Sequence, residues 1–357
     1  MNSNWKECKL GNVAEFKNGK SRPSEIVNGA IPIYGGNGIL GYTDTFNYQG
    51  ETVIVGRVGA YCGSVFFENK PIWVSDNALY TIPKNETDAK FLYYLLKSMG
   101  LNSQAEGSSH PLLTQTLLNS LDVFVTDSLP EQRAIAGVLS SLDDKIDLLH
   151  RQNKTLEGMA ESLWRKMFVE DTKNLKIVNL GEIIEIHDSK RIPLSSMQRE
   201  KMKDGVLYPY YGAATVMDHI NQYIFDGEYL LLGEDGTVET DDGYPVLQLA
   251  TGKFWVNNHT HVLRAKKPFS NFLLYIILRN TSISHIVTGA VQPKINQENL
   301  KSLEISSAKD IIVEELSVAV DNFWQKIQAN NLQIHTLSGL RNTLLPKLMT
   351  GEVRVSV

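Results

Sequence analysis

The sequence predicts an α+β fold that is built twice: two duplicated globular domains separated by two long helices that pack as an antiparallel coiled coil. Two observations carry this prediction. Short motifs of the first half return in the second half in the same order, and a long segment with coiled-coil spacing follows each copy. The chain has 357 residues, which is too long for one ordinary core and fits two domains with connectors.

The composition is that of a folded protein. Hydrophobic residues make up 42% of the chain and charged residues 21%, which excludes the disordered class. No run of about 18 apolar residues is present and the first residues are polar, so we expect neither a membrane span nor a signal peptide. The two cysteines, Cys8 and Cys62, cannot form a disulfide framework, and a reducing cytoplasm is the expected compartment.

The repeat consists of motif pairs whose offset only grows along the chain, from 170 to 177 to 182 residues, as expected for a duplicated domain with loop insertions. The pairs are Leu10–Gly11 with Leu180–Gly181, Tyr34–Gly35 with Tyr211–Gly212, Val53–Gly59 with Leu230–Gly236, Trp73–Asn77 with Trp255–His259, and Leu92–Leu96 with Leu274–Leu278.

Each copy combines strands with a short helix. Runs of apolar residues that end at glycines predict buried strands at Thr52–Val55, Ile72–Val74, Tyr229–Leu232 and Phe254–Val256. Apolar runs without glycine predict short core helices at Ala89–Leu96 and Phe272–Leu278. The loops between these elements hold most of the polar residues, and loops are where binding residues usually lie.

Two further segments have the alternating spacing of three and four that is typical of a coiled-coil seam. The first seam contains Leu142, Ile146, Leu149, Leu156 and Leu163, with Asn153 at the remaining position, and the second contains Phe323, Ile327, Ile334, Leu337 and Leu344. An asparagine in a seam typically fixes the register at some cost in stability. The first helix, which begins near Pro130, would be roughly 55 Å long.

We therefore expect a first domain at residues 1–130, a central helix at 131–172, a second domain at 173–308 and a C-terminal helix at 309–357. Two long seams at matching places most simply pack on each other antiparallel, although an extended single helix would also fit the period. A dimerisation stalk or a linker is the other interpretation of such helices. The duplication favours the first interpretation, since a generic stalk need not copy its globular head.

In its order of domain, helix, domain, helix, the chain resembles the specificity subunit of type I restriction-modification systems. The resemblance covers nearly the whole chain. It rests on Pro130–Asp147, on Leu344–Glu352, and on Val55–Gly59 followed by Val74–Ala78. Each motif alone is weak, but together, in order and duplicated, they are specific.

The resemblance implies that each globular domain is a target-recognition domain that reads one half of a bipartite, asymmetric site on double-stranded DNA. The helices would set the spacing between the half-sites and dock two copies of a modification subunit. That subunit would hold S-adenosylmethionine and methylate adenine at N6, and a separate restriction subunit would use ATP and Mg²⁺ for translocation and cleavage. The chain itself would be non-catalytic and would hold no cofactor.

Motifs of catalysis are missing from the sequence, in agreement with that implication. No Pro-Pro dipeptide is present for an adenine methyltransferase, and no Gly-x4-Gly-Lys-Ser/Thr motif for ATP. The glycines of Gly35–Gly38 predict a turn, and the adjacent Asp143 and Asp144 predict a solvated helix face. His259 and His261 lack an evident third ligand, so no metal site is expected.

Residues that could contact DNA are donors and aromatic residues in polar or glycine-rich segments. The candidates are Lys20, Ser21, Arg22, Arg57, Tyr61, Asn77, Ser108 and His110 in the first domain, and Lys190, Arg191, Tyr211, Thr237, Asn258, Gln292 and Lys294 in the second. Each could equally be an ordinary surface or turn residue. The two copies also diverge here, because Glu234 stands where the first copy has Arg57.

The net charge of −5 argues against a DNA-binding protein, since most such proteins are basic. Contact with DNA would then depend on local placement of charge, or on partners that neutralise the phosphates. Two rival functions stay open. One is a self-sufficient enzyme, and the other is a coiled-coil scaffold with two protein-binding heads.

Overall fold

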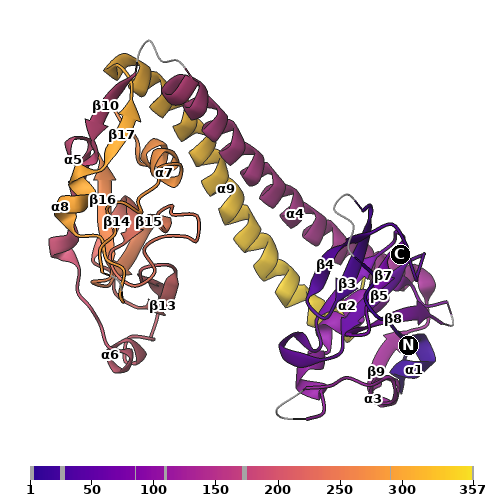
Figure 1. Cartoon of the computed structure of the whole chain (residues 1–357). Helices are drawn as coiled ribbons and strands as arrows, with labels where there is room; N and C mark the ends of the chain where they lie inside the picture. The colour runs from indigo at the N-terminus through magenta and orange to yellow at the C-terminus, as the bar shows by residue number, and fades with distance from the viewer. Residues whose placement is uncertain are drawn as a thin grey trace. The chain divides into compact units, whose positions relative to one another are not determined.

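The computed structural model describes residues 4–24, 29–84, 86–107, 111–170, 175–289 and 291–355. These residues form two compact units: unit 1 contains residues 1–149 and 332–357, and unit 2 contains residues 150–331. Each unit combines one α+β domain with a segment of each of two long helices (Figure 1). The predicted fold class, with two repeated domains and two long helices, is confirmed.

The domain of unit 1 is built on a sheet of order β2-β8-β5-β6, a sheet of order β4-β3-β7, and the pair β1-β9. Its strands are β1 (Trp5–Lys9), β2 (Ala14–Asn18), β3 (Ile31–Gly35), β4 (Gly38–Thr43), β5 (Thr52–Gly56), β6 (Val65–Glu68), β7 (Trp73–Val74), β8 (Ala78–Pro83) and β9 (Asp122–Thr126). Its short helices are α1 (Leu10–Val13), α2 (Ala89–Ser98) and α3 (Gln115–Ser120), with single 3-10 turns at Gly59–Tyr61 and Leu101–Gln104.

The domain of unit 2 has a six-stranded sheet of order β11-β16-β14-β15-β12-β13 and the pair β10-β17. Its strands are β10 (Lys176–Asn179), β11 (Ile184–Ile186), β12 (Tyr208–Tyr211), β13 (Val216–Ile220), β14 (Phe225–Gly233), β15 (Leu247–Val256), β16 (Thr260–Ala265) and β17 (Glu304–Ser307). Its short helices are α5 (Leu180–Ile183), α6 (Ser196–Glu200), α7 (Asn271–Arg279) and α8 (Gln297–Ser302), with a 3-10 turn at Asp188–Lys190.

The two domains differ where β6 and β7 of unit 1 correspond to the single strand β15 of unit 2. In both units the last residues of this stretch pair in parallel, Tyr34 with Val74 and Tyr211 with Val256. In unit 1, Pro71 lies between β6 and β7, and a proline has no N–H to offer to a sheet. The interrupted strand therefore leaves two sheets in unit 1 and one continuous sheet in unit 2.

The predicted core helices are present in both units and begin at side-chain caps. Asp88 accepts a hydrogen bond from Phe91 N before α2, and Ser270 accepts one from Leu273 N before α7. Both helices bury nearly all their apolar residues, including Leu92 and Leu274, in the core of their own unit. Each helix thereby fixes one face of its sheet.

The long helices are α4 (Leu129–Arg165), which continues into a π-helical turn at Lys166–Glu170, and α9 (Asp310–Met349). Their segments run antiparallel and lie side by side in each unit (Figure 1). In unit 2, Asn153 of α4 bonds to Asn331 of α9, and in unit 1, Asp143 bonds to Arg341. From Asn153 to Asp143, ten residues earlier on α4, the bonded residue on α9 changes from Asn331 to Arg341, ten residues later, as expected for antiparallel helices. No helix in the described part of the chain is long and apolar enough to cross a membrane.

The seam residues face inward along both helices. Ile146, Leu149, Asn153 and Ile327 are buried. The remaining seven are half-buried: Leu142, Leu156, Leu163, Phe323, Ile334, Leu337 and Leu344.

Candidate nucleic-acid interface

In unit 1, four loops that are far apart in the sequence meet at one end of the β2-β8-β5-β6 sheet. Lys20 N, after β2, donates a hydrogen bond to Val74 O before β8, at 2.9 Å. Arg57 N, after β5, donates to Asn77 O at 3.1 Å, and Leu113 N donates to Arg57 O at 2.9 Å. The main chain of Arg57 therefore joins the loop before β8 to the loop before α3.

Unit 2 builds the same loop cluster with equivalent hydrogen bonds. Glu234 N, after β14, donates to His259 O at 2.9 Å, and Ile295 N donates to Glu234 O at 2.9 Å. The next loop residues are also joined, since Gly236 N donates to Pro293 O at 3.0 Å. The duplication thus preserves the main-chain frame of the loops while their side chains change.

The structure brings most of the candidates of the first domain to this loop cluster. Exposed candidates are Lys20, Ser21, Arg22, Tyr61 and Asn77. Arg22 donates to Leu40 O at 3.1 Å, which holds it against β4. Arg57 is half-buried and donates through Nη1 to Asn18 Oδ1 at 3.0 Å. Ser108 and His110 lie outside the described residues.

The candidates of the second domain divide into two groups. Lys190, Thr237, Asn258, Gln292 and Lys294 are exposed on the loops. Tyr211 and Arg191 are half-buried. Burial raises the pKa of the Tyr211 phenol, and its ring contacts the ring of Phe254 with centroids 5.6 Å apart, so that much of this side chain serves the core.

Arg191 belongs to an ionic cluster at the base of the loops of unit 2. Its guanidinium pairs with the Glu234 carboxylate and lies 3.6 Å from Asp188. His261, which is fully buried, contacts Asp188 Oδ2 through Nδ1 at 2.6 Å and Ile295 O through Nε2 at 2.8 Å. Both contacts are to acceptors, so only the form of the ring with a hydrogen on each nitrogen satisfies both of them.

The acid of this cluster is held in its charged form. Burial by itself raises the pKa of Asp188. Hydrogen bonds from His261 and Val262 N, together with the charges of His261 and Arg191, lower it by more, so the net effect is a lowered pKa. Two carboxylates and two cations thus lie together in the interior. Mutual pairing of this kind is what makes buried charge tolerable.

Sequence reasoning did not find this cluster, although it named three of its members, Arg191, Glu234 and His261. No third ligand was evident for His259 and His261, but Asp188, Glu234 and His261 place their ligand atoms within 4.8 Å of one another. That geometry alone would suit a cation, and the guanidinium of Arg191 lies against both carboxylates. A signal was present in the sequence, since Asp188 and Glu234 lie at the repeat positions of Asn18 and Arg57.

Of the two adjacent acids of α4 in unit 1, Asp144 is exposed as expected, but the expectation was wrong for Asp143. Asp143 does not lie on a freely solvated helix face. It accepts a hydrogen bond from Tyr94 Oη at 2.9 Å and from Arg341 Nη1 at 2.7 Å, and Lys97 Nζ lies 3.7 Å away. These contacts join α2, α4 and α9 within unit 1. The glycines of Gly35–Gly38 do form the predicted turn, between β3 and β4.

The loop clusters present hydrogen-bond donors and aromatic rings on their described residues. Lysine, asparagine, glutamine, serine and threonine can hydrogen-bond to base edges or phosphates. Lys294 also lies 3.5 Å from Glu234, so its ammonium is positioned at the rim of the buried cluster. The arrangement is suited to binding a polar, anionic polymer, one surface for each unit.

Comparison with known proteins agrees with this geometry. A family model described as the type I restriction modification DNA specificity domain matches residues 2–158 and again residues 172–316. The MjaIX type I restriction enzyme specificity subunit of Methanocaldococcus jannaschii is 24% identical over 98% of this chain and 94% of its own. A putative type I restriction enzyme specificity subunit of Haemophilus influenzae is 33% identical over 35% of this chain and 31% of its own.

A solved structure has the same fold. The crystal structure of the S subunit of a type I restriction-modification system from M. genitalium superposes with a TM-score of 0.71, at 20% identity, over 98% of this chain and 96% of that one. The family model matches the chain twice, with the two matches covering the two domains of the repeat.

Proposed function

This chain belongs to the family of type I restriction-modification DNA specificity subunits, and from that premise we propose that each of its two domains reads one half of a bipartite, asymmetric DNA target. The observation that carries the proposal is the duplicated loop cluster, one in each unit, built on equivalent hydrogen bonds around Arg57 and Glu234. The chain is the specificity subunit and not the catalyst; other subunits of the complex supply catalysis.

The hydrogen-bond donors of the two loop clusters are the groups that we propose contact DNA. Base edges in the major groove are read by arginine, lysine, asparagine and glutamine, and phosphates accept from any donor. Unit 1 would use Lys20, Ser21, Arg22, Tyr61 and Asn77 with the Ser108 and His110 segment, and unit 2 would use Lys190, Tyr211, Thr237, Asn258, Gln292 and Lys294. Different residues at equivalent places predict different half-sites.

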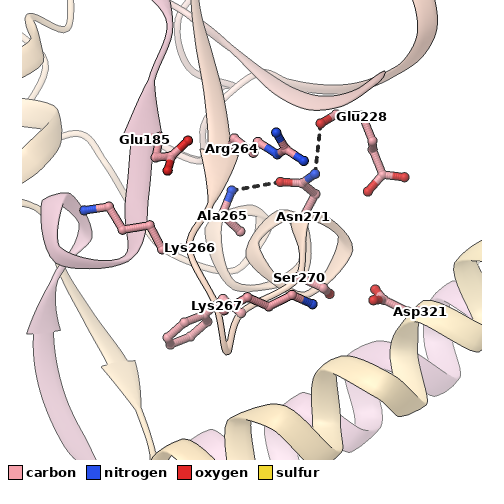
Figure 2. A pocket seen from close by; sticks show the side chains of 10 residues that line it. Glu185, Glu228, Arg264, Ala265, Lys266, Lys267, Ser270, Asn271 and Asp321 are labelled. Carbon is pink, nitrogen blue, oxygen red and sulfur yellow. Dashed lines mark hydrogen bonds between the residues drawn. The ribbon is translucent and has the colours of Figure 1, made fainter. Parts of the chain in front are cut away.

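The complex would contain two copies of an adenine-N6 methyltransferase subunit, docked in equivalent ways on the two halves of the duplication. A hollow of about 550 Å³ in unit 2, the Asn271 hollow, supports this proposal. Figure 2 shows Asn271 at its centre, accepting from Ala265 N at 2.8 Å and donating to Glu228 O at 3.0 Å. Its wall includes Lys267 from the loop before α7 and Asp321 from α9.

Unit 1 has a hollow at the equivalent place, the Asp88 hollow, with a volume of about 330 Å³. Glu51 lies there at the repeat position of Glu228, and Asp88 at that of Ser270. Its wall includes Arg133 of α4. Both hollows lie where a domain meets a long helix of its own unit, so one kind of partner surface could use both.

In this complex the cofactors belong to the partners. S-adenosylmethionine would be held by the modification subunits, and ATP with Mg²⁺ by a restriction subunit that moves along and cleaves DNA. The helices α4 and α9 would set the spacing between the half-sites. The excess of acidic residues would be offset by partners that contribute phosphate-neutralising surface. We expect such a complex to act where its DNA target lies, in the cytoplasm.

Methyl transfer by reconstituted mixtures tests the proposal. The purified chain, the candidate modification subunit, and the two together are each given labelled S-adenosylmethionine and genomic DNA. We expect methyl transfer to adenine only when the chain and the modification subunit are both present. Transfer by the purified chain alone would make it a self-sufficient enzyme. A mixture that forms a complex but shows no sequence-selective DNA binding would leave a protein-binding scaffold.

A further inference from the structure

We propose that the Arg191–Glu234 ion pair positions the DNA-contacting loops of unit 2. In unit 1 the pair Arg57–Asn18 would do the same, but there the arginine lies on the loop that corresponds to the loop of Glu234. The inference rests on the proposed function. It assigns these arginines to the support of the loops and not to the reading of bases.

The hydrogen bonds of Arg191 show that its guanidinium is already engaged. The side chain is 14% exposed and pairs with Glu234. Its Nη1 also donates to Thr260 O at 2.7 Å, and its Nε donates to Asp188 O at 3.0 Å. An arginine that reads guanine needs two adjacent N–H groups free to face the base edge. Arg191 instead joins three loops of its own unit.

The repeat positions show that unit 1 uses one guanidinium at the same place. Arg57 lies at the position of Glu234, at an offset of 177, and Asn18 lies at that of Asp188, at an offset of 170. Arg57 Nη1 donates to Asn18 Oδ1 at 3.0 Å. In unit 1 the arginine after β5 reaches the end of β2, and in unit 2 the arginine near the end of β11 reaches the loop after β14. The bridge is conserved within the chain although its direction is reversed.

The reversal explains the other buried charges of unit 2. An anion at position 234 and a second at 188 need two cations, and these are Arg191 and His261. Unit 1 has Ser21 and Leu79 at those repeat positions, and there the partner of Arg57 is the neutral Asn18. Lys294 of the loop before α8 lies 3.5 Å from Glu234 and is the further charged group at the rim.

A graft of one bridge onto the other unit tests the proposal in the complete modification complex. The graft variant carries Asp188→Asn, Arg191→Ser, Glu234→Arg and His261→Leu, which are the residues of unit 1 at the same repeat positions. The methylated motif of each complex is mapped by sequencing in a methylation-free host. Purified complexes are compared by binding to DNA that contains the mapped wild-type motif.

We expect the graft variant to methylate the same two half-sites as the wild type. Arg191→Ser alone should weaken specific binding at least about tenfold, the scale of a lost base-pair contact, through the half-site of unit 2. The matched control is Lys190→Ser, which removes one positive charge from the same loop at the exposed residue next to Arg191. A graft complex that methylates a different half-site would overturn the proposal, because the exchanged residues would then read bases.

A double-mutant cycle keeps the test decisive if the graft does not fold. The complexes with Arg191→Ser, with Glu234→Gln, and with both changes are compared in the same binding assay. If Arg191 and Glu234 act as a pair, the two changes are strongly coupled, and the double variant binds DNA no more weakly than the single variant with the lower affinity. Additive losses would overturn the proposal. A wild-type complex without any bipartite motif would instead contradict the proposed function, and so the two failures are distinguishable.

Discussion

Asn153 of α4 and Asn330 of α9 are buried against each other, and Asn330 Nδ2 donates to Asn153 Oδ1 at 2.8 Å. Asn153 Nδ2 in turn donates to Asn331 Oδ1 at 2.8 Å. The pairing allows one alignment of α4 with α9 in unit 2, because a shift by one turn would leave buried amides without partners. The seam asparagine thus has a polar partner on the opposite helix.

Replacement of one of these asparagines should destabilise the helix pair. Asn153→Leu leaves Asn330 Nδ2 buried without an acceptor, at an expected cost of about 1–3 kcal/mol in the free energy of unfolding. The double variant with Asn330→Leu should recover most of that loss, because an apolar seam is stable although it specifies register poorly. Denaturant unfolding measures both. Asn322→Leu, at an exposed position of α9, is the control, and an equal loss there would contradict the account.

Acid should weaken unit 2 through its paired carboxylates. A hydrogen bond from Lys203 lowers the pKa of Asp218 to about 2, with further hydrogen bonds from His219 N and Arg199, and these together outweigh the opposite effect of burial. The pKa of Asp188 is also lowered. A lowered pKa stabilises the fold above the unfolded value near 3.9, and this contribution is lost as the pH falls through the folded value. We expect a constant melting temperature between about pH 7 and 5 and a fall below about pH 4. Asp218→Asn should flatten that fall, and an unchanged slope would contradict the assignment.

The loop that carries Gln292 depends on a glycine. Gly289 has φ +91°, and a Cβ there would lie 2.3 Å from Gln292 O. Gly289→Ala should therefore disturb this loop and reduce binding through the half-site of unit 2, with little effect on the other half-site. Gly158→Ala, in an exposed turn of α4 with open space around it, should instead raise stability by about 0.5–1 kcal/mol. Normal DNA binding by the Gly289 variant would remove that loop from the proposed interface.

Charge reversal in one hollow should remove one modification subunit from the complex. Lys267→Glu changes the charge at the wall of the Asn271 hollow without altering the Asp88 hollow of unit 1. We expect native mass spectrometry to show complexes with one modification subunit in place of two. Lys301→Glu makes the same charge change at an exposed site of α8 outside the hollow. Retention of both subunits by the Lys267 variant would show that the hollow is not the docking site.

Much of the fold could be predicted because it depends on local pattern. The repeat, the buried strands around Val53 and Leu230, the capped helices α2 and α7 and the two seams are all written in spacing and apolar content. The separation of β6 from β7 was not anticipated, since it depends on how one interruption near Pro71 divides a sheet.

The candidate site was less accessible to sequence reasoning. The candidate loops could be named because their donors lie beside glycines, and the structure gathers most of them. The roles of Arg57 and Arg191 could not be separated, because a reader and a supporting bridge use the same residue type. Only the partners of each guanidinium, Asn18 and Glu234, distinguish the two.

Methylation sequencing tests the central claim most directly. The chain is expressed with its candidate modification subunit in a methylation-free host, and modified adenines are mapped across the genome. The account predicts a single bipartite, asymmetric motif that is absent when the chain is omitted. No motif, or the same motif without the chain, would contradict its role as the reader of the DNA target.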